Sequence, residues 1–234
     1  MTTMDSHLEG LPPRPLLALG LLVPVPTFGT LMAMVLAPGP VGQAVFLVCK
    51  AWILAFPLVW HLWVERGRPS LSPPRRGGFG AAVLTGAAII AIMFAAYFLL
   101  GGHWIDAEHV ARQAAKNGIG TRARYIAMAL FWILINSLME EYVWRWFVVR
   151  QCERLMRPSL AVVVSALLFT LHHVVALRVQ FDWRVTILAS LGVWCGGMTW
   201  SWLYVRYRSI WPCYVSHILA DVPIFVIGWW LIFS

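Results

Sequence analysis

Seven apolar stretches divide the chain, and most charged residues lie in the short segments between them. Each stretch is close to the roughly 20 predominantly apolar residues that a transmembrane helix needs. The stretches are 15–36, 42–64, 79–100, 123–149, 159–177, 185–205 and 209–233. The pattern predicts an all-α fold, a polytopic transmembrane helical bundle of about seven spans, with six to eight as the range.

A weaker pattern lies between the third and fourth stretches. In 104–118, Ile105, Val110 and Ala114 form an apolar stripe against Asp106 and Arg112, which predicts a short interfacial helix. We therefore expect a single membrane domain over 1–234. Within it, 1–122 supplies helices one to three and the interfacial helix, and 123–234 supplies helices four to seven.

The composition agrees with this interpretation. Hydrophobic residues make up 60% of the chain and charged residues 12%, and the mean hydropathy is +0.74, which excludes an ordinary soluble domain. The net charge of +8 comes mostly from arginines beside the spans, where they orient the protein and meet anionic lipid headgroups. The lipid bilayer is thus an expected partner and nucleic acid is not.

The arginines also predict an orientation. The loops at 66–76, 150–157 and 206–208 are rich in arginine and, because they alternate along the chain, share one side of the membrane. The positive-inside rule then places the N-terminus in the cytoplasm and the C-terminus outside. We expect no cleaved signal peptide at the N-terminus.

Six ionisable side chains lie deep within apolar stretches, where the pattern predicts hydrocarbon. A charged side chain at the bilayer centre costs at least ~2.5–3.5 kcal/mol on insertion scales. Charged side chains that faced the lipid separately would each carry this insertion cost, so we expect these groups to face one another inside the bundle. They are Glu140, Glu141, His172, His173, His217 and Asp221.

Helical spacing arranges these groups into pairs, because residues four apart share a face. We expect three such pairs: Glu141 with Arg145, Phe169 with His173, and His217 with Asp221. Adjacent residues diverge by about 100°, so Glu140 and Glu141 should not both point into one site. At ~1.5 Å per residue, Glu140, His173 and His217 lie roughly 14, 21 and 12 Å from the ends of their spans, and can meet within the membrane.

Three motifs in this order resemble a known family. Glu140-Glu141-x-x-x-Arg145 resembles its EExxxR motif, Phe169-x-x-x-His173 its FxxxH motif, and His217-x-x-x-Asp221 its HxxxN or HxxxD motif. The family is that of the CPBP intramembrane proteases, which includes the type II CAAX prenyl endopeptidases and the bacterial Abi bacteriocin-processing or immunity proteins. The resemblance covers about 125–225, and we expect a multi-pass protein of a prokaryotic plasma membrane.

The resemblance implies hydrolysis of a peptide bond in a membrane-anchored or prenylated peptide or protein. Glu140, with His173, would activate the attacking water, while His217 and Asp221 would stabilise the oxyanion with preset donors. Glu141, Arg145 and Phe169 would support these groups. Helices four to seven then form the catalytic part of the domain.

Asp221 departs from the many relatives that carry Asn at this position, since an ionised carboxylate would repel an oxyanion. Asp221 must therefore be protonated, orient His217 or ligate a metal. Glu140, His173, His217 and Asp221 form a plausible Zn²⁺ ligand set, but the preferred interpretation requires no cofactor.

Several nearby polar residues are expected to have structural roles, although the sequence leaves a part in the site open for each of them. His172 should point away from His173, and Lys50 should extend its charge toward an interface. Asn136 and Ser137 are typical interhelical hydrogen-bonding residues.

Two other functions share these residues. A catalytically silent immunity or regulatory relative could keep the fold, and a proton-coupled transporter could use the same intramembrane carboxylates and histidines as a relay. The sequence contains neither the inverted repeats nor the paired broken helices that are common in transporters. The protease interpretation is therefore preferred.

Overall fold

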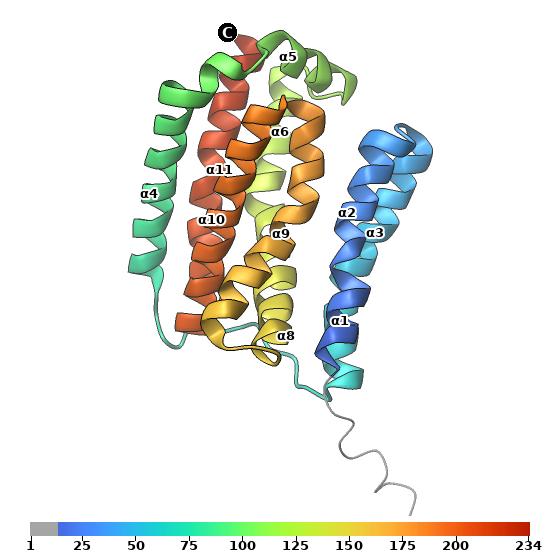
Figure 1. Cartoon of the computed structure of the whole chain (residues 1–234), viewed down its shortest axis with the longest axis vertical. Coiled ribbons are helices and arrows are strands. Elements are labelled where there is room, and N and C mark those ends of the chain that lie inside the picture. Colours follow the sequence, from blue (N-terminus) through green and yellow to red (C-terminus); the bar gives the residue numbers. More distant parts are fainter. Residues whose placement is uncertain (1–13) are drawn as a thin grey trace, which may run out of the picture.

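The computed structural model describes residues 14–234, and every regular element in that range is a helix (Figure 1). The predicted all-α helical bundle is thus confirmed. The expectation that no signal peptide is cleaved falls on residues 1–13, outside the described part of the chain.

The helical elements follow the predicted stretches closely. In chain order they are α1 (Pro15–Leu22), α2 (Pro24–Leu31), η1 (Met32–Leu36), α3 (Pro40–Val59), η2 (Trp60–Val64), α4 (Phe79–Ala96), η3 (Tyr97–Gly101), η4 (Gly102–Trp104), α5 (Ala107–Lys116), α6 (Arg122–Leu130), η5 (Phe131–Asn136), α7 (Ser137–Glu140), η6 (Glu141–Val149), α8 (Arg150–Glu153), α9 (Pro158–Gln180), α10 (Trp183–Tyr207) and α11 (Ile210–Phe233). Several adjoin without a break, so α6 to α8 form one helical segment of 32 residues.

Six helical segments within residues 14–234 are long and apolar enough to cross a membrane. They are Pro15–Leu36, Pro40–Val64, Phe79–Trp104, Arg122–Glu153, Pro158–Gln180 and Ile210–Phe233. The remaining long helix, α10, has 25 residues, enough for a span. It is less apolar than the others because its middle contains glycine, serine, threonine and tryptophan residues, and it lies lengthwise beside α9 and α11 (Figure 1).

Local sequence explains where many of these helices begin. Pro15, Pro24, Pro40 and Pro158 stand at the first helical position, where proline loses no hydrogen bond and its fixed φ suits the helix. Ser209 caps α11, because its hydroxyl accepts from the backbone N–H of Trp211.

The chain forms two groups of helices in space. The hairpin α1–α3 stands to one side of the helices that follow it (Figure 1). Hydrogen bonds connect it to the segment α6–α8, which we call the central segment. The Tyr142 hydroxyl donates to the Leu54 carbonyl at 3.0 Å, and Lys50 Nζ donates to Asn136 Oδ1 at 2.9 Å. The N-terminal and C-terminal parts of the chain therefore meet along α3.

The loops also divide between the two ends of the bundle. The starts of α1, α4, α9 and α11 gather at one end, and α5 and the C-terminus lie at the other (Figure 1). The arginine-containing segments 65–78, 154–157 and 208–209 all belong to the first end, as their alternation along the chain predicts. We call it the arginine-rich end.

The centre of the bundle is the π-helical segment η6. Eight of its nine residues are buried, whereas many leucines of the outer helices, such as Leu47 and Leu84, are exposed. A helix that is enclosed on all sides belongs to the interior of a bundle. The charged motif thus occupies the most enclosed helix, and the apolar surface is left to meet lipid.

Candidate functional site

Glu140 ends α7 and is 9% exposed. Its Oε1 accepts a hydrogen bond of 2.8 Å from Asn136 Nδ2, one helical turn earlier. The carbonyl of the same Asn136 side chain accepts from Lys50 of α3. Asn136 therefore links a cation on the N-terminal hairpin to the carboxylate, and fixes one of the two carboxylate oxygens.

Glu141 and Arg145 form a fully buried ion pair. Their Oε1 and Nη1 atoms are 3.5 Å apart, and the two side chains are 0% and 1% exposed. The guanidinium lies between the rings of Phe169 and Trp200, at 4.7 and 5.1 Å from their centroids. Such cation–π contacts strengthen when the cation is desolvated. The predicted pair is present, and Phe169 forms one wall around it.

His217 of α11 lies between the two glutamates. Its Nδ1 is 2.7 Å from Glu141 Oε1, and its Nε2 faces Glu140 Oε2 at 3.7 Å. The ring stacks on Trp200 with centroids 3.8 Å apart. We expected one of the adjacent glutamates to face the site and the other to support it. Both also reach one imidazole, because the ring presents its two nitrogens in different directions.

Asp221 stands one turn beyond His217, and its Oδ1 is 3.8 Å from His217 Nε2. Its other oxygen, Oδ2, is 2.6 Å from the Ser137 hydroxyl. That hydroxyl also contacts the Trp132 carbonyl at 2.9 Å. Asp221 is therefore tied to the helix that carries Glu140, through Ser137.

His173 lies on α9 with its ring 4.5 Å from that of Phe169. Its Nδ1 is 3.1 Å from the Phe169 carbonyl oxygen. A carbonyl can only accept, so Nδ1 carries the proton in this contact. The other nitrogen, Nε2, is then free to accept a proton or bind a metal when the ring is neutral.

The expectation that His172 points away from the site is wrong. Its ring centroid is 4.1 Å from that of His173, and both rings border the same cavity. His172 stacks on Trp144 at 5.6 Å with nearly parallel planes, and its buried Nδ1 has no hydrogen-bond partner among the described residues. Adjacent residues share this cavity because it extends across more than one face of α9.

The cavity has a volume of about 320 Å³ and lies between the N-terminal hairpin and the central segment. Its walls come from α2, η1, α3, α9 and the segment α6–α8, and most of the lining side chains are apolar. The ionisable groups that line it are Lys50, Glu140, His172 and His173. His217 and Asp221 are not among the lining residues. The four predicted site residues are therefore neighbours, but only two of them border the cavity.

One set of three side chains in the described chain could hold a metal ion. The candidate ligand atoms of Glu140, His172 and His173 lie within 4.8 Å of one another. A carboxylate and two imidazoles are ligands that suit Zn²⁺, and the unpartnered His172 Nδ1 fits such a role. The set differs from the predicted one, since His172 takes the place of His217 and Asp221.

Sequence reasoning gave four of these residues no direct part in the site. Asn136 had a usable signal, because it precedes Glu140 by one helical turn, and Ser137 similarly precedes Glu141. Lys50 had a weaker one, a lone cation within an apolar stretch. His172 had none, since only the shape of the cavity decides whether both adjacent histidines face it.

Membrane-length helices enclosing a cluster of carboxylates and imidazoles define a class: polytopic membrane proteins with a site inside the membrane region. Residues 122–223 match the family model described as type II CAAX prenyl endopeptidase Rce1-like. This match supports assigning that region of the chain to the CPBP/CAAX protease family. The comparisons with curated proteins and with solved structures each gave no match.

Proposed function

We propose that this protein hydrolyses a peptide bond in a membrane-anchored or prenylated substrate, with Glu140 as the general base. The observation that supports this most directly is the meeting of Glu140 and His173, from two helices, on one wall of an apolar cavity. An apolar cavity with a few convergent polar groups is the usual form of a ligand site. The match of residues 122–223 to an endopeptidase family favours this chemistry over transport.

In this proposal the attacking water lies between Glu140 and His173. Glu140 accepts a proton from the water, and the free Nε2 of His173 orients it. Asn136 holds Oε1 of the glutamate, so Oε2 is the oxygen that takes the proton. A base must lie within hydrogen-bond reach of the proton that it removes, and these two residues border both the cavity and each other, with His172 beside them.

We further propose that Asp221 is protonated in the working enzyme. The Ser137 hydroxyl has one proton, yet two oxygens contact it, one from Asp221 and one from the Trp132 carbonyl. If Asp221 donates its own proton to Ser137, then Ser137 can donate to Trp132 and every contact is a hydrogen bond. A neutral acid also removes the repulsion that an ionised carboxylate would exert on a nearby oxyanion.

His217, protonated on both ring nitrogens, would then stabilise the oxyanion from behind Glu140, as the family resemblance suggests. The neutral Asp221, whose proton goes to Ser137, adds no opposing charge beside it. Glu141 holds His217 Nδ1, which leaves Nε2 directed at Glu140 and Asp221. Since neither residue lines the cavity, substrate binding must bring the reacting carbonyl past Glu140 to reach them. We expect the carbonyl to reach this position only in the enzyme–substrate complex, where catalytic hydrogen bonds shorten.

A bound zinc ion would supply a Lewis acid at the cavity wall. Glu140, His172 and His173 are the residues that would hold it. Our preferred mechanism requires no ion, because Glu140 and His173 already provide a base and an orienting group. We place the arginine-rich end in the cytoplasm of a prokaryotic cell, in accord with the positive-inside rule.

The test compares the wild type with Glu140→Gln on a panel of membrane-anchored peptides that includes prenylated C-terminal sequences. The amide keeps the shape and removes the base, so we expect cleavage to fall by roughly 10²–10⁴-fold, the usual contribution of a general base. Glu108→Gln, on an exposed side chain of α5, is the matched control and should cleave like wild type. Equal rates for Glu140→Gln and wild type would reject the mechanism.

The panel also separates the other functions. A wild type that cleaves none of the peptides but moves protons across liposomes, in a manner lost in Glu140→Gln, would favour a transporter. A folded wild type with neither activity would favour a catalytically silent relative.

A further inference from the structure

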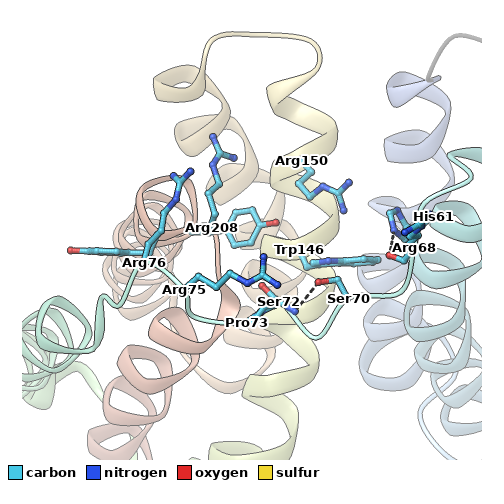
Figure 2. A pocket seen from close by; sticks show the side chains of 12 residues that line it. His61, Arg68, Ser70, Ser72, Pro73, Arg75, Arg76, Trp146, Arg150 and Arg208 are labelled. Atoms are coloured by element: carbon cyan, nitrogen blue, oxygen red, sulfur yellow. Dashed lines mark hydrogen bonds between the residues drawn. The ribbon is translucent and has the colours of Figure 1, made fainter.

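A second cavity lies at the arginine-rich end, apart from the candidate catalytic site. It has a volume of about 410 Å³, within the range of small-molecule sites. Five arginines line it: Arg68, Arg75, Arg76, Arg150 and Arg208. Arg68, Arg75 and Arg76 lie on the loop 68–76 itself. Arg208 lies near Arg76 at one side, and Arg150 lies toward Arg68 and His61 at the other (Figure 2). No acidic residue is among its lining residues.

Neighbouring carboxylates neutralise only part of this charge. Arg208 pairs with Glu153 at 2.6 Å, and Arg150 lies 3.8 Å from Glu65. Arg68, Arg75 and Arg76 have no carboxylate within 4.0 Å among residues 14–234. Three guanidinium groups thus remain to bind an anion, and each presents a rigid fork of donors that suits phosphate oxygens.

The loop that carries these arginines is held in place by buried hydrogen bonds. The Ser209 hydroxyl donates to the Ser72 carbonyl at 2.6 Å, and the backbone N–H of Ile210 donates to the Ser72 hydroxyl at 3.0 Å. The indole of Trp211 also donates to the Leu71 carbonyl at 2.9 Å. The start of α11 therefore holds the loop in place at Leu71 and Ser72.

Two residues that line the cavity adopt the left-handed conformation without being glycine. Ser72 has φ of 53° and Arg208 has φ of 55°. Such backbone strain persists only where the surroundings enforce it, and it is concentrated at functional sites. The cavity is thus a pre-organised cluster of donors, completed by the serine and tyrosine side chains of its wall.

We propose that this cavity binds a phosphate group, and specifically the headgroup of an anionic phospholipid at the membrane surface. Basic cavities between transmembrane helices at the cytoplasmic side are suited to such headgroups. Its volume exceeds that of a lone phosphate and leaves room for a glycerol or sugar, whose hydroxyls can bond to Ser70, Tyr204 and Tyr207. We place the phosphate beside Arg75 and Arg76, because Arg68 lies apart from them, next to His61 (Figure 2).

The experiment uses the full chain in neutral detergent micelles. The thermal unfolding temperature is followed while phosphatidylglycerol, phosphatidylcholine or inorganic phosphate is added, because a ligand that binds only the folded state raises that temperature. A rise with phosphatidylglycerol, but not with phosphatidylcholine or inorganic phosphate, supports a lipid headgroup. A rise with inorganic phosphate at comparable concentration retains the phosphate site and assigns it to a soluble ligand instead. No rise with either anion overturns the proposal.

Charge-matched variants test the location. Arg75→Gln with Arg76→Gln should raise the phosphatidylglycerol concentration that gives half of the maximal rise in unfolding temperature by roughly tenfold or more. The reason is that each lost charge-assisted hydrogen bond is worth about a factor of ten in affinity. Arg14→Gln with Arg157→Gln removes the same charge from exposed residues at the same end, outside the cavity lining, and should change it less than about twofold. An equal loss of lipid affinity in the two double variants would mean that the lipid is attracted by the overall surface charge, and would reject the site.

If the glutamine pair does not fold, Arg75→Lys with Arg76→Lys replaces it. Lysine keeps the charge but loses the fork, so a weaker but still selective loss is expected, and unchanged binding would reject the site. Peptide cleavage is not measured, so the outcome is independent of the proposed protease activity.

Discussion

The buried pair Glu141–Arg145 makes a quantitative prediction. Arg145→Met should leave Glu141, 0% exposed, without its cation, and should remove the contacts of the guanidinium with Phe169 and Trp200. Breaking a buried ion pair by removing one partner costs about 3–5 kcal/mol. At ~2–4 °C per kcal/mol for a chain of this size, the unfolding temperature should fall by roughly 6–20 °C.

The chain offers a matched control with the same spacing. Glu108 and Arg112 are also four residues apart on a helix, with Oε2 and Nη1 3.2 Å apart, but their side chains are 88% and 58% exposed. Exposed pairs contribute about 0–1 kcal/mol, so Arg112→Met should lower the unfolding temperature by less than about 4 °C. Thermal unfolding of both variants in the same detergent gives the comparison.

The double variant Glu141→Gln with Arg145→Met sharpens the test. It removes both charges, so the penalty for an uncompensated buried carboxylate disappears, and part of the lost stability should return. The reasoning is refuted if Arg145→Met and Arg112→Met lower the unfolding temperature equally. It is also refuted if the double variant unfolds at a lower temperature than Arg145→Met alone.

Three further predictions concern the site and its surroundings. Asn136→Leu should break the link from Lys50 to Glu140 and lower kcat by roughly 10–100-fold, with little change in KM; a change in KM alone would mean that Asn136 only shapes the cavity. Chelation should leave cleavage unchanged, and loss of activity restored by zinc would instead assign Glu140 and His172 to a metal site. Burial opposes ionisation of Glu65, but hydrogen bonds from His61 and Gln151 and the charge of Arg154 outweigh it, so the pKa of this carboxyl is lowered. Its stabilisation is present above the ordinary glutamate pKa of about 4.3 and is lost as pH falls through the lowered value; Glu65→Gln should reduce the steepness of acid unfolding, measured by the unfolding temperature against pH.

The spans could be predicted from the sequence because hydrophobic length is a one-dimensional property. The predicted stretch 123–149 became Arg122–Glu153, and 159–177 became Pro158–Gln180. The meeting of Glu140, His173 and His217 also followed from their depths, since charged groups in hydrocarbon must find one another. Length and the cost of burial are both visible in a single chain.

Rotation of side chains about their helices could not be predicted in the same way. The spacing of 100° per residue suggested that His172 would turn away, yet it borders the same cavity as His173. The same spacing suggested that only one of the two glutamates would face the site, and only Glu140 lines the cavity, but the spacing did not predict that both would lie beside His217. Such contacts depend on the width of a cavity and on where a third helix places its ring, and neither is encoded in local spacing.

The wall of the candidate catalytic cavity has two origins along the chain. Glu140, His172 and His173 come from the region that matches the endopeptidase family, whereas α2, η1 and α3 precede that region entirely. Substitutions in the hairpin can therefore reshape the cavity while Glu140, His172 and His173 stay unchanged. Lys50 is the exception, because within residues 14–234 it alone connects the hairpin by a hydrogen bond to the side chain that holds Glu140. Under the proposed function, specificity and reactivity are therefore separable, and α1–α3 is the segment to exchange when a new substrate is sought.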